Sequence, residues 1–369
     1  MVGILSCILL ISPEPWETLA VSKHHYAREL VRRGHRVLFY GPPAGAGPLQ
    51  LDAVAAEGTG RLEVLRSPPV ALGLRLMPST LRRVLEARWL ARVENLAGGR
   101  IDVVWLFENS RFFNMHFAGE RLKIYHQVDL DQNFKPEEAA ATADISLAIS
   151  TPIESRISGS ARRILRITHG CPPRSTCDSE PSQLDAAFSR KRVNAVMTGN
   201  MSRAYLDLDV LADLIDKHPD VGFHFVGRHD RGLGLHARVS EASNVVFWGQ
   251  YPASALPAFL DRADVLLAIY KAEHCAQMAN PHKMMEYFAA GRCVLASRTL
   301  EYENRPDLVE TARSRDDLKA RFAAIVADPP AFNTPDLIAR RRAFAADNTY
   351  PRQLDRIAAA LGPSGRLIS

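Results

Sequence analysis

A short, buried helix is predicted by the stretch Asn280-Pro281-His282-Lys283-Met284-Met285-Glu286-Tyr287-Phe288-Ala289-Ala290-Gly291. Asn280 suits an N-cap, Pro281 suits the first helical position, and Gly291 lies where a helix would end. Because the body is mostly apolar, we expect the helix to be buried and residues 293–297 to follow as a core strand. Such a helix directs free N–H groups and the positive end of its dipole toward any cleft at its start, which favours anions there.

Two charged residues stand out in this apolar helix. Lys283 falls in the first turn, and Glu286 follows three residues later on the same face. A lysine beside a helix N-terminus can neutralise a diphosphate, and a glutamate one turn deeper can accept both hydroxyls of a ribose. A structural ion pair is the alternative, but such pairs contribute only about 0.2–0.5 kcal/mol and are typical of solvated faces. The two residues therefore predict a nucleotide-diphosphate subsite without a metal.

Strand and helix patterns alternate on both sides of this stretch. The strands expected in the first half are 2–11, 35–40, 61–65, 101–107, 122–126, 144–149 and 163–167, and those in the second half are 193–198, 221–226, 244–247, 264–268 and 293–297. Because many of them are apolar on both faces and helices separate them, parallel sheets covered on both sides are predicted. We expect an α/β fold of two Rossmann-like, doubly wound domains facing a central cleft.

The domain boundaries follow from composition. Residues 169–190 hold three prolines and four serines, which predicts a linker. This places an N-terminal domain over residues 1–168 and a C-terminal domain over residues 191–347. Residues 348–369 are expected to form a helix that packs back toward the N-terminal domain.

Length, charge and cysteine content exclude several classes of protein. The 369 residues suffice for two domains at about 150 residues each. A net charge of +5 is too small to indicate nucleic-acid binding. Five scattered cysteines have no zinc-site spacing and are typical of a reduced, cytoplasmic protein. The apolar run at residues 2–11 is too short to span a bilayer, so we expect a buried strand there.

Residues 280–297 resemble the donor-site signature of GT-B glycosyltransferases of group 1, typified by family four, in which a helix N-P-x-K-x-x-E-Y-x-A-x-G precedes a short strand. Other segments share the resemblance. Residues 198–201 and 225–227 resemble the two glycine turns of the donor domain, residues 244–265 its base-binding region, and residues 169–170 the motif after the linker. The resemblance covers residues 165–345 well and the first half in outline.

The resemblance implies roles for individual residues. Lys283 would hold the donor phosphates and assist departure of the leaving group electrostatically, Glu286 would bind the ribose, and the backbone near Gly249 would contact the base. The implied donor-binding residues are Gly199, Asn200, Arg203, Gly227, Arg228, Gly249, Gln250, Tyr251, Asn280, Pro281, His282, Lys283 and Glu286. In the family's E-x7-E pair, Met278 occupies the earlier position here, which leaves the contact to the transferred sugar open.

Asp129 is the candidate general base, because it follows the strand at residues 122–126. With Asp131 it also forms D-x-D, a metal-binding motif of GT-A enzymes, but nothing else resembles that fold. A solvated loop aspartate or a helix N-cap is the third interpretation. A weaker resemblance to xanthan-type glucuronosyltransferases, which are inverting enzymes with an aspartate after the corresponding strand, supports the base. A base at Asp129 implies inversion, whereas a dominant role of Glu286 and backbone amides implies retention.

The expected acceptor-binding residues belong to the first half. Trp16 stands where relatives often have a glycine-rich turn, and it is suited either to stacking on a sugar or to simple packing. Glu108 and Asn109 end the strand at residues 101–107 and are expected to line the same wall. Arg88 and Arg92 are projected inside an apolar helical stripe, where they would reach lipid headgroups, an acceptor lipid diphosphate or buried acids.

A membrane contact is one interpretation of the arginine-rich segment at residues 75–92. Its apolar and cationic residues are those of an interfacial helix, in which arginine reaches the headgroups and tryptophan anchors. The protein would then work at the inner face of the cell membrane, as a peripheral protein.

The predicted function is transfer of a sugar from a nucleotide diphosphate to a glycan or glycolipid acceptor in bacterial cell-surface polysaccharide biosynthesis. UDP-sugar is the favoured donor because most relatives use it, and the transferred group would be a hexosyl or glucuronosyl unit. The nucleotide sugar is a co-substrate, so no cofactor and no metal are expected. A sugar-nucleotide epimerase and a non-catalytic nucleotide-sugar binding protein are the alternatives. A dehydrogenase is disfavoured because Pro13 and Pro15 stand where G-x-G-x-x-G would follow the first strand.

Overall fold

The computed structural model describes residues 6–18, 20–43, 45, 47–130, 134–174 and 183–369. The chain divides into two compact units, each of which is described by itself. The N-terminal unit consists of Met1–Thr168 and Tyr350–Ser369, and the C-terminal unit consists of His169–Thr349. The residues at 169–190 that the sequence separates as a linker are thus grouped with the C-terminal unit.

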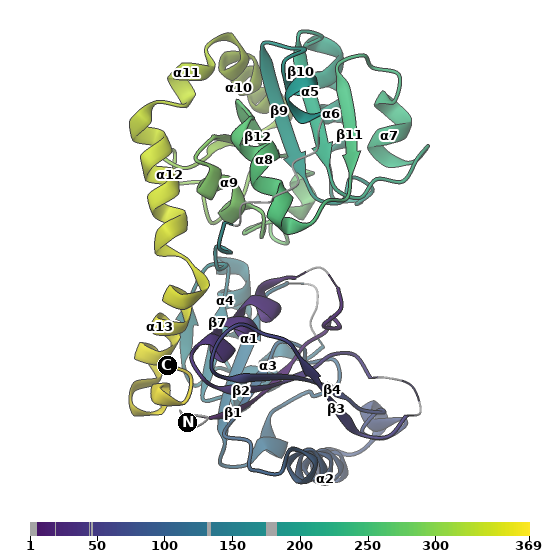
Figure 1. The fold of residues 1–369 in the computed structure, drawn as a ribbon, viewed down its shortest axis with the longest axis vertical. Coiled ribbons are helices and arrows are strands. Elements are labelled where there is room, and N and C mark those ends of the chain that lie inside the picture. The colour runs from purple at the N-terminus through teal and green to yellow at the C-terminus, as the bar shows by residue number, and fades with distance from the viewer. Residues whose placement is uncertain (1–5, 19, 44, 46, 131–133, 175–182) are drawn as a thin grey trace. The chain divides into compact units, whose positions relative to one another are not determined.

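The described residues of the N-terminal unit form an eight-stranded sheet (Figure 1). Its strands, in spatial order, are β3 (Gln50–Val54), β4 (Arg61–Arg66), β2 (Arg36–Tyr40), β1 (Cys7–Ile11), β5 (Val103–Leu106), β6 (Leu122–Gln127), β7 (Ile145–Ala148) and β8 (Ile164–Arg166). All neighbours are parallel except β3, which runs antiparallel to β4. The strand order reverses between β1 and β5, as in a doubly wound sheet.

Both faces of this sheet are covered, because successive side chains of a strand point to opposite sides. Ile8 and Leu10 of β1 join a core that includes residues of α1 (Ser22–Arg32) and α13 (Tyr350–Leu361). Leu9 and Ile11 join a second core, which includes residues of α2 (Ser79–Ala97). The remaining helices of the unit are η1 (Leu74–Leu76), η2 (His116–Ala118), α3 (Pro136–Thr142), α4 (Thr151–Ile157) and η5 (Gly362–Leu367).

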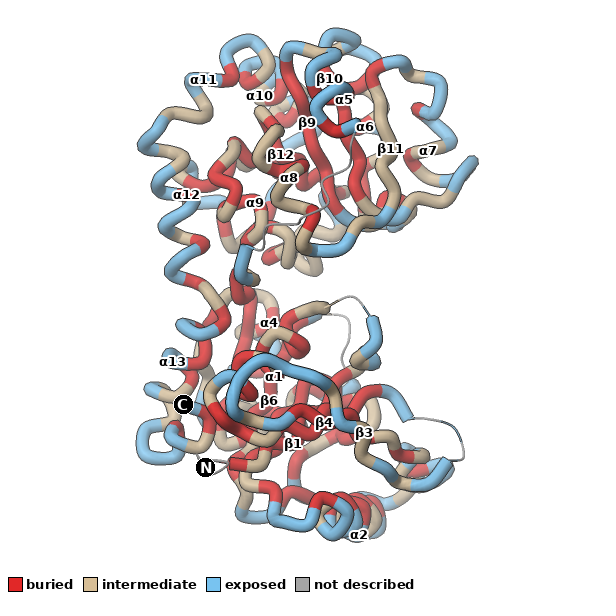
Figure 2. The backbone as a smooth tube through the Cα atoms, viewed as in Figure 1, coloured by how far each residue is buried: buried red, intermediate tan, exposed pale blue. Residues whose placement is uncertain are grey.

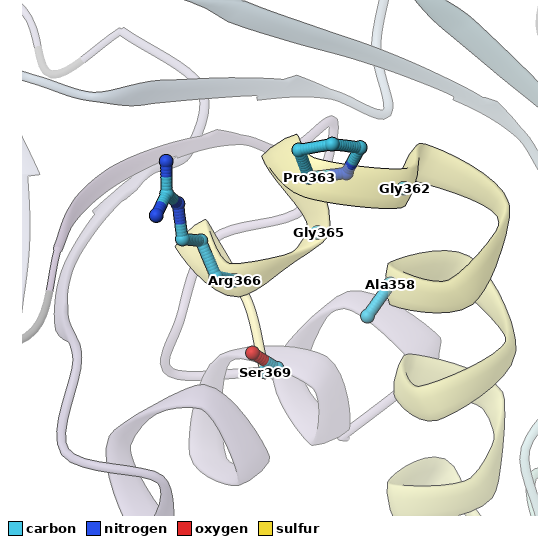
Figure 3. A pocket seen from close by; sticks show the side chains of 6 residues that line it. All are labelled: Ala358, Gly362, Pro363, Gly365, Arg366 and Ser369. Atoms are coloured by element: carbon cyan, nitrogen blue, oxygen red, sulfur yellow. The ribbon is translucent and has the colours of Figure 1, made fainter.

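The C-terminal segment belongs to the N-terminal unit. Leu354 and Ile357 of α13 are fully buried, and Asp355 pairs with Arg33 at 2.9 Å just after α1. The end of α13 and the residues after it border a shallow, open pocket of about 430 Å³ (Figure 3). Its lining residues are Ala358, Gly362, Pro363, Gly365, Arg366 and Ser369, none of which is a predicted site residue. The segment therefore completes the core of this unit by packing on α1.

The described residues of the C-terminal unit form a six-stranded parallel sheet. Its strands, in spatial order, are β11 (Val245–Gly249), β10 (Val221–Val226), β9 (Val193–Thr198), β12 (Val265–Ala268), β13 (Cys293–Ser297) and β14 (Glu310–Ala312). Its helices are α5 (Leu184–Phe188), α6 (Leu208–Lys217), α7 (Gly234–Val239), η3 (Ala253–Ala255), α8 (Leu256–Asp261), η4 (Ala272–His274), α9 (Met284–Ala290), α10 (Arg315–Ala327), α11 (Pro329–Phe332) and α12 (Pro335–Asp347). Counted from β9, the order is third, second, first, fourth, fifth, sixth, which is the classic dinucleotide-binding order with its switch between β9 and β12.

Helix α2 corrects the prediction for the arginine-rich segment. Its buried residues are Arg82, Glu86, Trp89, Leu90, Val93 and Ala97. Arg88 and Arg92 are exposed rather than inside an apolar stripe, and the apolar residues Leu81 and Leu96 of the same helix are 48% and 42% exposed. The projection of the helix placed the buried face wrongly because the Arg82–Glu86 pair is buried, and hydrophobicity alone cannot indicate that burial. In the part of the chain that is described, no helix is both long and apolar enough to cross a membrane.

Candidate functional site

Three glycines follow three adjacent strands of the C-terminal unit, at the carboxyl edge of the sheet. Gly199 follows β9, Gly227 follows β10, and Gly249 ends β11; all three have positive φ. The Gly199 N–H donates to Val226 O at 2.9 Å, and the Gly227 N–H donates to Gly249 O at 2.7 Å. A Cβ at Gly227 would stand 1.9 Å from Gly199 O, so only glycine permits this approach. The two predicted glycine turns and the end of the predicted base-binding strand are thus brought together in one stretch of accessible backbone.

Lys283 lies beside these three glycines, Gly199, Gly227 and Gly249, which together form the glycine row. Its ammonium nitrogen donates to Thr198 O at 3.1 Å and to Leu267 O at 3.4 Å, the first at the end of β9 and the second in β12. These are the two strands between which the strand order reverses. The cation is therefore held at the topological switch point, where open α/β sheets bind their ligands.

Tyr287 supports the same position, a role that sequence reasoning missed. Its hydroxyl accepts a hydrogen bond from the Thr198 N–H at 2.9 Å and donates to Leu267 O at 3.2 Å. Its ring centroid lies 5.6 Å from the Lys283 ammonium, and the ring of Tyr270 lies 5.4 Å away. The spacing of four residues between Lys283 and Tyr287, which puts both on one helix face, is the signal that could have revealed this.

The charges of Lys283 and Glu286 are both disfavoured by burial. Burial lowers the pKa of the Lys283 ammonium to about 7, an effect that Glu286 opposes. Burial raises the pKa of the Glu286 carboxyl to about 7, an effect that Lys283 opposes. Each residue keeps some accessible surface, and in the described chain no ion pair joins the two. Because burial disfavours both charges in the free protein, an anionic ligand would stabilise the Lys283 ammonium, and a ligand that donates hydrogen bonds would stabilise the Glu286 carboxylate.

The start of α9 differs from the prediction. The helix begins at Met284 with Lys283 as its N-cap, three residues later than expected. Asn280 does not cap it, because the Asn280 Oδ1 accepts a 2.7 Å hydrogen bond from the Tyr302 hydroxyl. The Met284 N–H is bound to Pro281 O at 3.0 Å, so this amide is already satisfied within the preceding turn. Lys283, rather than the helix terminus, is the group here that would hold an anion.

His169 and His282 lie together at the same end of α9. Their ring centroids are 4.9 Å apart, and the His169 Nε2 lies 3.1 Å from Asn280 O. Cys171 continues this contact, with its thiol 3.7 Å from Met285 O. The segment that the sequence named as a motif after the linker therefore packs on the predicted donor helix.

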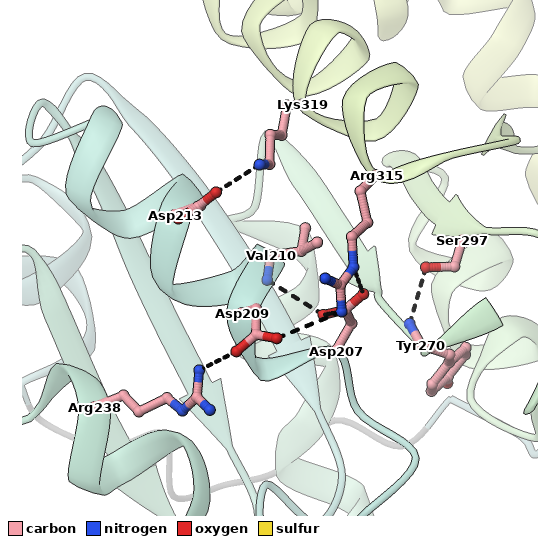
Figure 4. A network of polar contacts seen from close by, with 9 residues as sticks. All are labelled: Asp207, Asp209, Val210, Asp213, Arg238, Tyr270, Ser297, Arg315 and Lys319. Carbon is pink, nitrogen blue, oxygen red and sulfur yellow. Dashed lines mark hydrogen bonds and ion pairs between the residues drawn. The ribbon is translucent and has the colours of Figure 1, made fainter. Parts of the chain in front are cut away.

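An ion-pair network around Asp207 (Figure 4) lies at the far end of the loop between β9 and α6. This loop carries Asn200 and Arg203. Asp207 caps α6 by accepting from the Val210 N–H at 3.3 Å, and Arg315 of α10 pairs with the same carboxylate at 2.8 Å. The Asp207 side chain is only 5% exposed, whereas the Asp213–Lys319 pair beside it lies nearer to solvent. The loop that leaves the glycine turn is thus anchored at its far end.

The other predicted donor residues surround this edge in different ways. Asn200 accepts from the Ser202 N–H at 2.9 Å, so its amide shapes the loop. Arg203 is exposed and makes no ion pair in the described chain; Arg228 is exposed and lies 3.5 Å from Asp230. Gln250 is exposed just after β11, and Tyr251 packs on Phe259 with 5.1 Å between ring centroids. Arg203 is therefore an exposed cation without an ion pair among the described residues, whereas Arg228 is already paired with Asp230.

In the N-terminal unit, Asp129 lies where the sequence placed it, two residues after β6, and it is exposed. Its backbone carbonyl accepts from the Gln127 side chain at 3.3 Å. Asp131, its partner in D-x-D, lies outside the described residues. Within those residues, no group of three or more His, Cys, Asp and Glu side chains could hold a metal ion.

Trp16 packs against the sheet and also lines a pocket. Its ring centroid lies 5.0 Å from that of Phe39 and 5.3 Å from that of His24. The Arg28 guanidinium lies over the indole at 5.2 Å, and both residues border a cavity of about 220 Å³. Trp16 is therefore half-buried by Phe39, His24 and Arg28, and it also borders this cavity.

Glu108 and Asn109 are buried and already have partners. Arg111 pairs with Glu108 at 2.6 Å and donates to Ser12 O at 2.6 Å and to Gly41 O at 2.5 Å. These contacts join the ends of β5, β1 and β2, at the switch point of this sheet. The Asn109 amide donates to Phe134 O at 2.8 Å. In this structure, both side chains support the loops rather than present a free polar group.

Comparisons with known proteins agree with these features. Residues 192–328 match the family model of group 1 glycosyl transferases. Sucrose-phosphate synthase from Thermosynechococcus elongatus aligns over 96% of this chain and 99% of its own, with a TM-score of 0.69 and 14% identity. Trehalose-6-phosphate synthase OtsA aligns over 97% of this chain and 99% of its own, with a TM-score of 0.70 and 13% identity. Anabaena HepE in complex with UDP aligns over 96% of this chain and 99% of its own, with a TM-score of 0.66 and 14% identity. The chain has the GT-B fold.

The fold class and the resemblance predicted from residues 280–297 are therefore confirmed. The matched family segment contains the three glycine turns and Lys283. No curated protein matches the sequence significantly.

Proposed function

We propose that this GT-B protein is a glycosyltransferase that uses a UDP-sugar donor. The observation that carries the proposal is the Lys283 ammonium, 3.1 Å from Thr198 O at the switch point and next to the bare backbone of the glycine row. A cation and exposed backbone at this edge suit a nucleotide diphosphate. The solved structure of HepE, which has the same fold, is a complex with UDP, and this supports uridine as the base.

In the proposed reaction, the bond between the anomeric carbon and the β-phosphate oxygen breaks, and a bond from that carbon to an acceptor hydroxyl oxygen forms. Lys283 neutralises the charge that develops on the departing UDP, and Glu286 accepts hydrogen bonds from the ribose. Asp129, exposed after β6, takes the proton of the acceptor hydroxyl. The chemistry is proposed to need no metal or cofactor, because Lys283 provides the countercharge for the diphosphate.

The acceptor is proposed to be a glycan or glycolipid of bacterial cell-surface polysaccharide synthesis, and the transferred group a hexosyl or glucuronosyl unit. Trp16 with its neighbouring cavity, which Arg28 also lines, supports a planar stacking surface for a sugar.

A thermal-shift screen of the full chain against nucleotide sugars tests the donor. A ligand at 100 times its dissociation constant adds about 2.7 kcal/mol of stability. We expect UDP and at least one UDP-sugar to raise the melting temperature in the presence of EDTA, and GDP and ADP to raise it less. If no nucleotide diphosphate does so, the donor site is wrongly assigned.

Release of UDP then separates the three candidate activities. A transferase releases UDP much faster when an acceptor is present, an epimerase interconverts UDP-sugars without releasing UDP, and a binding protein does neither. Acceptor-independent interconversion of sugars would overturn the transferase proposal.

A further inference from the structure

The cavity of about 220 Å³ beside Trp16 lies entirely within the N-terminal unit. Its walls are Trp16, Arg28 and Arg32 of α1, residues 55–57 after β3, and Leu62 of β4. Pockets for drug-sized ligands measure about 300–1,000 Å³, so this one suits a single small ring.

The wall that Trp16 forms is fixed from behind. The Val21 N–H donates to the His24 Nδ1 at 3.2 Å, so the His24 Nε2 carries the proton and donates to Pro15 O at 3.1 Å. The same imidazole lies 5.3 Å from the indole, and the ring of Phe39 lies 5.0 Å from it. Groups outside the cavity therefore hold Trp16 in place.

The wall that follows β3 is packed on the end of α1. Residues 55–59 are exposed (Figure 2), but the backbone beneath them lies close to the helix. The Gly60 N–H donates to Val31 O at 3.0 Å, and a Cβ at Gly58 would stand 2.5 Å from the Arg32 Cα. Gly58 also has φ +119°, so this approach requires glycine. The cavity is thus bounded by backbone that the fold fixes on both sides.

Arg28 is a cation of this cavity without an acidic partner. Among the described residues it makes no ion pair and no hydrogen bond, and its guanidinium lies over the indole at 5.2 Å. Arg32, one turn later, is paired with Glu57 at 3.0 Å and with Glu29 at 3.5 Å. Burial lowers the pKa of Arg28, and Arg32 lowers it further, whereas Glu57 opposes the shift. The charge of Arg28 is therefore partly desolvated and not compensated by the described chain.

The chemistry of the lining selects the kind of ligand. Arg28 and Arg32 contribute two positive charges and Glu57 one negative charge, which leaves the cavity with a net charge of +1. A carboxylate carries one negative charge and matches the fork of a guanidinium, whereas a phosphate monoester carries about −1.5 to −2. Trp16 and Leu62 add apolar surface for ring carbons. A small ring that bears one carboxylate meets all of these conditions.

We propose that this cavity binds a uronic acid residue of the acceptor glycan and that Arg28 recognises its carboxylate. The N–H groups of Arg28 donate to the carboxylate oxygens, and the carbon face of the sugar contacts Trp16 and Leu62. A neutral sugar leaves Arg28 as unpaired as it is in the free protein, so the acidic sugar is preferred. The role in transfer rests on the proposed function, whereas binding itself needs no donor.

Saturation-transfer NMR titrations of the full chain without nucleotide test the proposal. The ligands are methyl β-glucuronide, methyl β-glucoside and glucose 6-phosphate. We expect the glucuronide to bind at least about tenfold more tightly than the glucoside, because only the glucuronide forms charge-assisted hydrogen bonds with Arg28. Arg28→Gln should remove this preference and leave binding of the glucoside unchanged. Arg28→Lys, which keeps the charge without the fork, should retain part of it.

A matched control makes the same change on another helix. Arg83 is exposed on α2 and does not line the cavity, so Arg83→Gln should bind all three ligands as the unmodified protein does. Equal binding of glucuronide and glucoside, or an equal loss in Arg83→Gln and Arg28→Gln, would overturn the proposal. Tighter binding of glucose 6-phosphate than of glucuronide would also overturn it, because the ligand group would then be a phosphate.

The outcome can be separated from that of the donor screen. If the glucuronide binds through Arg28 while no nucleotide diphosphate raises the melting temperature, the transferase proposal fails and the uronate site stands. If UDP-sugars bind while the glucuronide is not preferred, the uronate site fails and the transferase proposal stands.

Discussion

The ammonium nitrogen of Lys283 lies 3.1 Å from the carbonyl oxygen of Thr198. Thr198 ends β9, and the second carbonyl on the same ammonium belongs to Leu267 of β12. The main chain of two adjacent parallel strands therefore positions the cation, and no acidic side chain neutralises it by a direct contact in the described chain. A ligand anion at this edge would meet a charge that the fold has already oriented, which is the arrangement that electrostatic catalysis requires.

Replacing Lys283 by methionine tests that assignment. Lys283→Met should reduce UDP-sugar turnover by about 10²–10³, because the departing diphosphate loses its countercharge. The free energy of unfolding should change by no more than about 1–2 kcal/mol, since the lost hydrogen bonds are offset by relief of a buried charge. Turnover and urea unfolding are measured on the same preparations. Lys217→Met, at the exposed end of α6, is the control and should retain full activity. Unchanged turnover in Lys283→Met would remove the residue from the mechanism.

The affinity for UDP should depend on pH. In the free protein, Lys283 loses its proton as pH rises through about 7, because burial lowers its pKa. A bound diphosphate stabilises the ammonium and raises that pKa, so affinity is complete below pH 7 and falls above it, by at most about tenfold per pH unit. Glu286, whose pKa burial raises to about 7, ionises over the same range, and its carboxylate accepts the ribose hydrogen bonds better than the acid does, which makes the fall less steep.

Isothermal titration calorimetry between pH 6 and 9, in buffers of different ionisation enthalpy, measures this dependence. We expect proton uptake on UDP binding at pH 8, and a much flatter profile in Lys283→Met. A dissociation constant that does not change with pH in the unmodified protein would contradict the prediction.

Gly227→Ala should be strongly destabilising. The added Cβ would stand 1.9 Å from Gly199 O at a φ of +137°, so both the clash and the backbone conformation oppose it. We expect a loss of at least about 3 kcal/mol in the free energy of unfolding. Gly249→Ala, where φ is +78° but the space is open, should lose only about 1–2 kcal/mol. Gly99→Ala, with open space, is the control, and urea unfolding followed by circular dichroism ranks the three.

The ion pairs around α6 should differ in strength according to burial. Asp207→Ala removes a helix cap and the nearly buried partner of Arg315, which is 56% exposed and keeps Asp209 at 3.5 Å, so it should destabilise the protein by about 1–2 kcal/mol. Asp213→Ala breaks the more exposed pair with Lys319 and should cost less than about 1 kcal/mol. Urea unfolding of both variants, with a double-mutant cycle for each pair, measures the difference. Equal coupling energies would show that burial does not set their strength.

Sequence patterns alone predicted most of the architecture, because a strand buried on both faces is nearly all apolar. The runs that became β1, β5, β9 and β12 were recognisable for this reason. β3 was not predicted, because Gln50–Val54 is an edge strand without a fully buried residue, and its hydrogen bonds to β4 alone define it. Whether an edge strand pairs depends on its partner strand, so the sequence of the edge strand gives little information about the pairing.

The candidate site was determined in part by the sequence of residues 280–291 itself. The types and spacing of Lys283 and Glu286 in an apolar helix predicted both as site residues, because such charges are rarely placed in a buried helix without a partner. Only the tertiary structure decided where the ammonium lies. Strand pairing brings Thr198 and Leu267 side by side although they are far apart in the chain, and their carbonyls orient Lys283.

Tertiary contacts also decided which helix face of the arginine-rich segment is buried. Arg82 and Glu86 of α2 are buried as a pair, so the face that contains them faces inward and Arg88 faces water. The spacing of apolar residues placed Arg88 inside the apolar stripe, and it gave no reason to bury Arg82, because an isolated arginine is costly to bury. The sequence thus determined the chemistry present in each segment, and the tertiary structure decided which groups it neutralises and which it leaves to a ligand.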